Sequence, residues 1–174
     1  MTNATTGAVP YASYIAIFVS GSCHAQLGGG SFAAELIRVQ DGATLKSLPL
    51  EGGAIGTTNN RMELSAAISA MKRIKKDEAD PILIYSASAY LTDNGNTGNE
   101  RWTANGWISS DGEAVQNADL WKELFALCEG RNVTFHLSPR SAKSPDLART
   151  YARAAKLRDQ WAKKAALALF GETA

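Results

Sequence analysis

The sequence has few cysteines, no basic residue in its first 37 positions and no long apolar run. Two cysteines in 174 residues, Cys23 and Cys128, provide no disulfide framework, which is typical of a reducing compartment and predicts a cytoplasmic protein. No apolar run approaches the roughly 20 residues that a membrane-spanning helix needs. The first Lys or Arg is Arg38, so the apolar segment 14–19 lacks the basic residues that begin a signal peptide. We therefore interpret this segment as a β-strand.

The composition, 45% hydrophobic and 20% charged, is that of a folded domain, and the length suits a single one. We expect a domain over 13–171, with flexible tails at 1–12 and 172–174. Apolar periodicity and Gly/Pro punctuation predict strands at 14–19, 32–39, 44–50, 82–85 and 133–137, and helices from about 60 to 74, at 118–128 and at 145–170. Residues 92–117 are rich in Asn, Gly and Asp, and predict a long loop or a short helix with an excursion. This order is that of a mixed α/β protein.

Positive charge gathers near the C-terminal end of a chain whose net charge is only +1. Residues 140–164 contain eight Lys or Arg and two Asp, whereas the remainder of the chain is net acidic. Such a stripe is typical of a phosphate-binding surface, and equally of the solvated face of a helix. Charge alone leaves both interpretations open.

The chain is organised around residues 57–64, Thr-Thr-Asn-Asn-Arg-Met-Glu-Leu, where a polar turn runs into a helical pattern. Asn60 can cap this helix, and Glu63 then falls at the capping-box position three residues later. Glu63 can therefore serve either the helix start or a catalytic site.

Six segments, in order, resemble the type 1 ribonuclease H family from about Tyr14 to Ala168. They are residues 19–23 (VSGSC), 57–64 (TTNNRMEL), 85–90 (YSASAY), 102–107 (with Trp102 and Gly106-Trp107), 117–121 (NADLW) and 158–162 (RDQWA). The resemblance implies a ribonuclease H-like α/β fold. This fold is a five-stranded mixed sheet, three antiparallel strands and then two more, flanked by helices with a long C-terminal one.

The family hydrolyses the RNA strand of RNA–DNA hybrids with two divalent ions, Mg²⁺ or Mn²⁺, held by four carboxylates. By resemblance these carboxylates fall at Ser20, Glu63, Ala87 and Asp159, of which only Glu63 and Asp159 are acidic here. The family's His-containing loop corresponds to residues 138–143, which contain no His. The sequence therefore predicts an inactive member that holds no metal at full occupancy.

Substrate-holding residues are also implied by the resemblance. Contacts to the duplex minor groove and backbone are expected at Gly21, Ser22, Cys23, Asn59 and Asn60, and a grip on a DNA-strand phosphate at Thr58 and Asn117. The basic stripe adds Arg140, Lys143, Arg149 and Arg153 as candidates. Turn and capping roles can also account for Gly21, Asn60 and Asn117. His24 and His136 are isolated, and we expect His136 to be structural.

The long helix from Pro145 is expected to cover the region of the missing His loop. Its small residues Ala148, Ala152, Ala155, Ala162 and Ala166 share a stripe with Asp159, and this stripe is expected to face the sheet. Asp159 would then point toward the former metal site or pair with Lys163.

The first functional hypothesis is an inactive protein that binds RNA–DNA hybrid, another duplex or a protein partner. The second is an active hybrid endoribonuclease, in which Asp93 or Glu35 substitutes for the missing acids, or an active parent whose acids were removed by design. The third is a structural subunit of a larger assembly.

Overall fold

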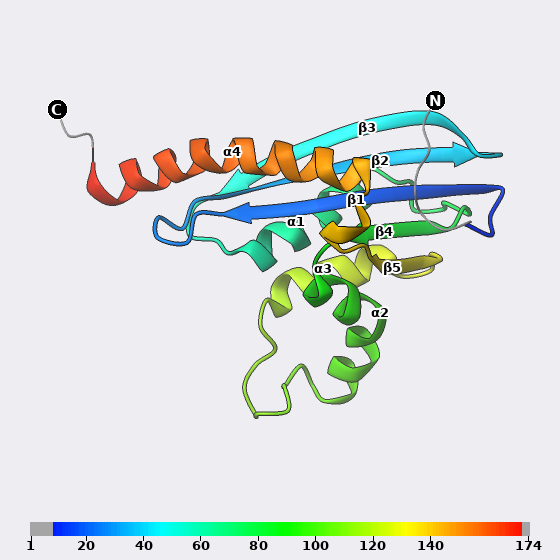
Figure 1. Cartoon of the computed structure of the whole chain (residues 1–174). Helices are drawn as coiled ribbons and strands as arrows, with labels where there is room; N and C mark the ends of the chain where they lie inside the picture. Colours follow the sequence, from blue (N-terminus) through cyan, green and yellow to red (C-terminus); the bar gives the residue numbers. More distant parts are fainter. Residues whose placement is uncertain (1–8, 172–174) are drawn as a thin grey trace.

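Residues 9–171 are described by the computed structural model, and five of their segments form one mixed sheet (Figure 1). The strands are β1 (Ser13–Cys23), β2 (Gly30–Gln40), β3 (Ala43–Ala54), β4 (Ile82–Ser86) and β5 (Val133–Leu137), in the spatial order β3-β2-β1-β4-β5. β1, β2 and β3 form an antiparallel meander, and β4 and β5 run parallel to β1. The predicted sheet of three antiparallel strands and two more is confirmed. β1 continues through Ser20–Cys23, which the sequence pattern treated as its end.

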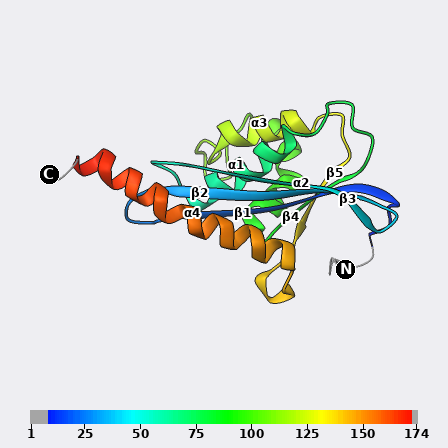
Figure 2. The same ribbon diagram turned by 90° about the horizontal axis from the view of Figure 1, so that it is seen from above.

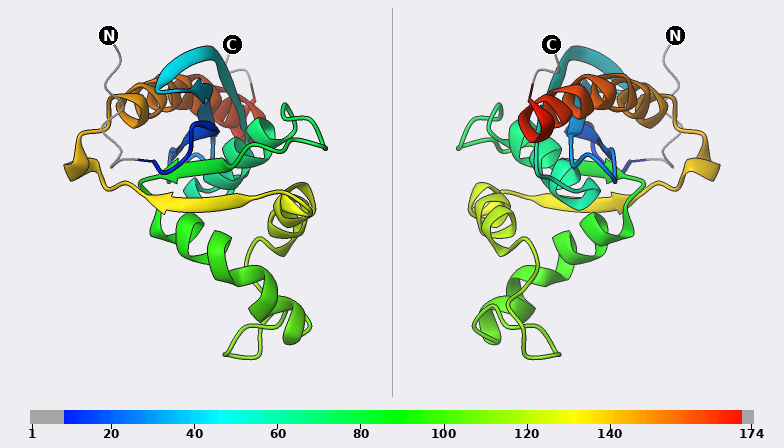
Figure 3. Two further views of the ribbon diagram at one scale, coloured as in Figure 1. Left: turned by 90° about the vertical axis from the view of Figure 1, so that its right-hand side faces the viewer. Right: turned by 90° about the vertical axis from the view of Figure 1, so that its left-hand side faces the viewer.

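Helices cover both faces of this sheet, as Figures 1 and 3 show. α1 (Asn59–Met71), α2 (Ala89–Ala104) and α3 (Ala118–Cys128) lie on one face, and α4 (Pro145–Phe170) lies on the other. The short 3₁₀ helix η1 (Arg140–Ala142) joins β5 to α4. Alternate β1 side chains serve the two layers, because strand side chains alternate between faces. Ile15, Ile17 and Val19 join the large core under α1–α3, whereas Ala16 and Phe18 pack with Leu147 of α4.

α4 begins and ends where the sequence predicts. The Ser144 hydroxyl caps the helix by accepting from the Leu147 amide, Pro145 takes the first turn, and Gly171 follows the last residue with φ +70°. Residues 145–158 are regularly helical, and they follow η1 directly, so the helix starts as early as expected. Figure 2 shows its C-terminal end extending past the ends of the strands.

The face that α4 turns to the sheet differs from the prediction. Its buried residues are Asp146, Leu147, Thr150, Ala154, Ala162 and Ala165. Ala148 and Ala152 are exposed, as is Asp159. A stripe of small residues identified the helix but placed its contact face wrongly, because the alanines continue around the helix and carry little directional information.

The segment 92–117 contains more helix than predicted. α2 runs for 16 residues, from the Ser88 cap to Ala104, with Gly95 and Gly98 in its interior. A Cβ at Gly95 would lie 2.5 Å from the Phe135 ring, and one at Gly98 would lie 2.8 Å from the Trp102 ring. Close packing therefore stabilises a helix whose intrinsic propensity is low. Residues 105–117 remain irregular.

The predicted tails fall largely outside the described residues, which exclude 1–8 and 172–174. Within residues 9–171, no helix combines the length and the apolarity that crossing a bilayer requires.

Candidate nucleic-acid site at the ends of the central strands

A cavity of about 230 Å³ lies where β1 and β4 end beneath the start of α4. Its lining comprises Ser20, Gly21, Glu63, Ala87, Ser138, Pro139, Arg140, Lys143, Ser144, Leu147, Ala148 and Tyr151. Three of the predicted catalytic positions, Ser20, Glu63 and Ala87, thus meet in one place, although they are far apart in the sequence. The charged residues of the lining are Glu63, Arg140 and Lys143.

Glu63 faces this cavity and does not cap its helix. α1 begins one residue earlier than predicted, since the Thr58 hydroxyl caps it by accepting from the Arg61 amide at 3.3 Å. Asn60 therefore lies inside the helix, and the capping-box interpretation of Glu63 is wrong. The Gly21 amide donates to Glu63 Oε1 at 3.0 Å, and Ser86 Oγ donates to Oε2 at 2.9 Å.

The surroundings of Glu63 favour its protonated form. Burial raises the pKa of the carboxyl from 4.5 to about 7, against the opposing effects of the Gly21 and Ser86 hydrogen bonds and of the Arg140 charge. This pKa is that of a lone acid in a poorly hydrated pocket.

Gly21 is required by the closeness of β1 and α1 at this point. A Cβ there would lie 2.7 Å from the Glu63 amide nitrogen and 2.9 Å from the Asn59 carbonyl oxygen. Both are backbone atoms, so a side chain at this position would push the start of α1 away from the strand. Gly21 therefore sets the distance across which Glu63 reaches the site.

Ser20 is bonded to α4 and is buried. Its Oγ lies 3.0 Å from Thr150 Oγ1, which also donates its hydrogen to the Leu147 carbonyl at 2.9 Å. Because Thr150 has a single hydroxyl hydrogen, Ser20 is the donor of the pair. Thr150 was missed by sequence reasoning, although the 147-150-154 spacing marks it as a residue of the buried helix face.

Asp159 is not part of the site, which corrects the prediction made from its position in the C-terminal segment. It lies nine residues after Thr150, about 13 Å further along the helix axis. Its side chain is 65% exposed and pairs with Arg158 at 3.0 Å, rather than with Glu63 or Lys163. The α4 residues that reach the cavity come from its first two turns. Within residues 9–171, no group of three or more His, Cys, Asp or Glu side chains could hold a metal ion.

The two suggested substitute acids are also remote from the cavity lining. Glu35 forms an ion pair with Arg153 and accepts from Ser47, and Asp93 is an exposed residue of α2. His136 stacks on Tyr85 with ring centroids 5.1 Å apart and shares a 2.8 Å hydrogen bond with Thr134. Burial lowers the pKa of His136, and its packing confirms the structural role expected of it.

The four basic candidates divide into two pairs. Arg153 donates to the Ala34 carbonyl at 2.8 Å and pairs with Glu35 at 3.1 Å, so it fastens α4 to the sheet. Arg149 pairs with Asp146 on the same helix. Arg140 and Lys143, by contrast, line the cavity and are exposed. The basic stripe is therefore largely structural beyond its first turn.

The predicted duplex contacts near the end of β1 differ in accessibility. Ser22 is 6% exposed, and Cys23 donates from Sγ to the Thr57 carbonyl at 3.2 Å. Burial raises the pKa of the Cys23 thiol. Gly21 reaches the cavity, and Asn59 is exposed at the start of α1. The Ser22 side chain is therefore not available to a ligand, whereas Asn59 is.

Thr58 and Asn117 lie at the starts of α1 and α3, but Arg61 joins them. Arg61 donates to Asn117 Oδ1 at 3.3 Å and forms a two-pronged ion pair with Asp119 at 3.0 and 2.7 Å. Asn117 has φ +58° and makes no side-chain cap; its Nδ2 donates to the Tyr90 hydroxyl at 3.0 Å. The predicted phosphate grip thus carries a cation whose charge is balanced by Asp119.

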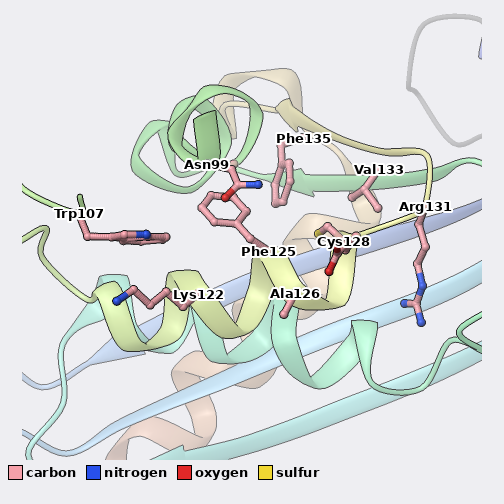
Figure 4. A pocket seen from close by; sticks show the side chains of 11 residues that line it. Asn99, Trp107, Lys122, Phe125, Ala126, Cys128, Arg131, Val133 and Phe135 are labelled. Atoms are coloured by element: carbon pink, nitrogen blue, oxygen red, sulfur yellow. The ribbon is translucent and has the colours of Figure 1, made fainter. Parts of the chain in front are cut away.

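A second cavity, of about 420 Å³, lies between α2, α3 and β5 and is shown in Figure 4. None of the predicted site residues lines it. Lys122 lies over the Trp107 ring at 4.9 Å, and Arg131 donates to the carbonyls of Met71 and Ile74. Burial raises the pKa of Cys128 to about 12, so its thiol stays protonated near neutral pH. This cavity offers no reactive group.

Comparison with known proteins agrees with this fold and site. The family model described as RNase H matches residues 12–139. The chain is 40% identical to the Ribonuclease H of Chlorobium phaeovibrioides over 123 residues, which cover 70% of this chain and 80% of that protein. It is 44% identical to the Ribonuclease H of Jannaschia sp. over 109 residues, 62% and 67% of the two chains.

Among solved structures, the chain resembles LC9-RNase H1, described as a type 1 RNase H with the type 2 active-site motif. The TM-score is 0.72 at 20% identity, covering 88% of this chain and 76% of that one. LC11-RNase H1 in complex with RNA/DNA hybrid gives a TM-score of 0.55 at 19% identity, covering 87% and 98%. Together with the six ordered sequence motifs, these matches show that the chain belongs to the ribonuclease H family.

Proposed function

We propose that this ribonuclease H-family protein binds RNA–DNA hybrid or a related duplex without cleaving it. The observation that carries the proposal is the composition of the cavity at the former catalytic positions. Glu63 supplies its one carboxylate, Ala87 supplies a methyl group, and the Ser20 hydroxyl is engaged by Thr150.

These residues do not fit a pair of divalent ions. Mg²⁺ and Mn²⁺ gain most from anionic oxygens, because Mg²⁺ in particular gives up its water reluctantly. A single carboxylate whose pKa is raised to about 7 offers at most one negative charge to two dications. Arg140 and Lys143 on the same cavity add repulsion. We therefore infer that the protein has no tightly bound metal cofactor and no metal-dependent hydrolysis.

Duplex binding is supported by what the structure retains. LC11-RNase H1, which shares the fold, is described in complex with RNA/DNA hybrid. In this chain Gly21, Asn59 and the basic pair Arg140 and Lys143 lie around one opening or beside it. RNA-containing duplexes are recognised mainly by shape and by contacts to phosphates and 2′-hydroxyls, which do not require the catalytic acids.

A cleavage assay on a labelled RNA–DNA hybrid, with Mg²⁺ and separately with Mn²⁺, tests the proposal. The unmodified protein should bind hybrid by anisotropy and leave it intact. The comparison variant is Ser20→Asp/Ala87→Asp/Ala148→Asp. Ala148 is included because it is an exposed α4 residue on the cavity lining, where an added carboxylate can face Glu63.

Cleavage by the unmodified protein would contradict the proposal and favour the active-enzyme alternative. Cleavage by the triple variant alone would show that the groove still presents substrate. A protein partner is the remaining alternative, and one feature favours it: Leu167, Leu169 and Phe170 are exposed at the projecting end of α4. A protein that bound no duplex would turn attention to that end.

A further inference from the structure

The cavity beside Glu63 is lined by more positive than negative charge. Arg140 and Lys143 outnumber its single carboxylate, and the Ser20 and Ser144 hydroxyls are already used within the protein. A pocket that holds cations needs the opposite arrangement. The lining therefore favours an anionic ligand.

Arg140 and Lys143 differ from the other cations of this region in having no acidic partner among the described residues. Arg149, Arg153 and Arg158 are each paired with a carboxylate at or near the surface of α4. No ion pair or hydrogen bond within residues 9–171 engages the side chains of Arg140 and Lys143. Their charges are thus available to a ligand.

The position of both side chains is set by the local backbone and by one aromatic contact. The Ser138 amide donates to the Ser86 carbonyl at 2.8 Å, which fastens the start of the connection to β4. η1 follows and ends at Lys143, whose φ of +52° turns the chain into α4. The Arg140 guanidinium lies over the Tyr151 ring at 4.0 Å. This stacking covers one face of the guanidinium and leaves the donors on its edge free.

We propose that this cavity is a metal-independent site for one phosphodiester of a nucleic-acid backbone, held by Arg140 and Lys143. The planar fork of a guanidinium matches two phosphate oxygens, and an ammonium adds a point charge beside it. The apolar lining from Pro139, Leu147 and Ala148 suits the sugar atoms on either side of the phosphate. The choice of a phosphodiester over other anions rests on the proposed function.

In this arrangement the protein's own cations take the place that divalent ions hold in a hydrolytic site. They neutralise the phosphate, but they supply neither an activated water nor a Lewis acid for the leaving oxygen. The site therefore binds the backbone and leaves it intact.

The test compares hybrid affinity by fluorescence anisotropy, in EDTA and in Mg²⁺, for the wild type and three variants. Arg140→Ala should weaken binding by about 10-fold, and Arg140→Lys should restore part of the loss, since it keeps the charge without the fork. Arg158→Ala is the matched control, because it removes the same charge from an exposed ion pair of α4; we expect less than about a 2-fold change. EDTA should leave wild-type affinity unchanged.

Wild-type binding that needs Mg²⁺, or equal affinities for Arg140→Ala and Arg158→Ala, would overturn the site. A second probe, the dinucleotide TpT with its single phosphodiester, separates the site from the proposed function. In NMR spectra TpT should shift the Arg140 Nε–H and Ala87 amide resonances of the wild type, but not the Ala87 resonance of Arg140→Ala. Such shifts without hybrid binding would keep the site and reject duplex binding, whereas no shift in the wild type would reject the site.

Discussion

Glu63 shows how a single substitution nearby changes the chemistry of a conserved-looking side chain. In a site with bound dications its carboxylate would be charged, but here Ser20 and Ala87 remove the neighbouring acids and burial raises the pKa of Glu63 to about 7. The Gly21 and Ser86 hydrogen bonds hold the group in place whether or not it carries a proton. Geometry has thus outlasted the charge at this position.

This raised pKa predicts a pH-dependent stability. The unfolded chain releases the Glu63 proton near pH 4.5, whereas the folded protein keeps it to about pH 7. The folded state therefore binds more protons between these values, and the contribution of Glu63 to the free energy of unfolding falls as pH rises, by up to about 3 kcal/mol. Urea denaturation in EDTA at pH 5 and pH 8 checks this. Glu63→Gln keeps the acceptor for Gly21 and should gain stability relative to the wild type at pH 8; parallel pH profiles would contradict the assignment.

At the scale of elements, α4 is held to the sheet by close backbone contacts as well as by side chains. Gly29, in the turn before β2, and Gly53, near the end of β3, both approach Trp161. A Cβ at Gly29 would lie 2.4 Å from the Trp161 carbonyl oxygen, and one at Gly53 would lie 2.2 Å from the indole nitrogen. Toward the N-terminal end of the helix, Arg153 and Thr150 provide the corresponding attachments. α4 therefore crosses three strands with little clearance (Figure 2).

Gly29→Ala should therefore destabilise the protein more than its neighbour Gly28→Ala. At Gly28 the cost is only backbone strain, about 1–2 kcal/mol for a φ of +66°, because the nearest atom to its Cβ lies at 3.8 Å. At Gly29 the added methyl meets the backbone of α4, which cannot rotate away, so we expect a loss of about 3 kcal/mol or more. Thermal unfolding measures both variants, and the Trp161 Nε1–H resonance should shift in Gly29→Ala alone. Equal losses would show that the close approach is not tight.

At the scale of the whole molecule, the basic stripe is only partly a binding surface. Eight cations in residues 140–164 suggest a strong electrostatic footprint, but Arg149, Arg153 and Arg158 are paired within the protein. At the other side of the opening, Asp119 balances Arg61. The electrostatic contact with a duplex should thus be small and concentrated at the cavity.

A shallow salt dependence follows from this charge pattern. If Arg140 and Lys143 make the phosphate contacts, the logarithm of the association constant should fall with the logarithm of salt concentration with a slope of about −2. Anisotropy titrations of the hybrid across a salt series provide the slope. A value of zero would exclude phosphate contacts, and one steeper than about −4 would require cations beyond this pair.

Local patterns predicted much of the architecture. Apolar runs indicated all five strands, and Ser144-Pro145 and Gly171 marked both ends of α4, because capping and turn chemistry act within a few residues. The motif at 57–64 led correctly to the family and to Glu63. α2 was underestimated, because its glycines are stabilised by Phe135 and Trp102, which local propensity does not register.

The sequence alone determined the strand order along the chain, the family, and the absence of acids at Ser20 and Ala87, since these depend only on residue identity and short-range pattern. The tertiary structure decided which face of α4 meets the sheet, and therefore that Asp159 lies in solvent while Thr150 bonds Ser20. It also decided which cations are free, because an ion pair depends on where side chains from distant segments come to lie. One turn of helix separates positions that a stripe of alanines cannot distinguish.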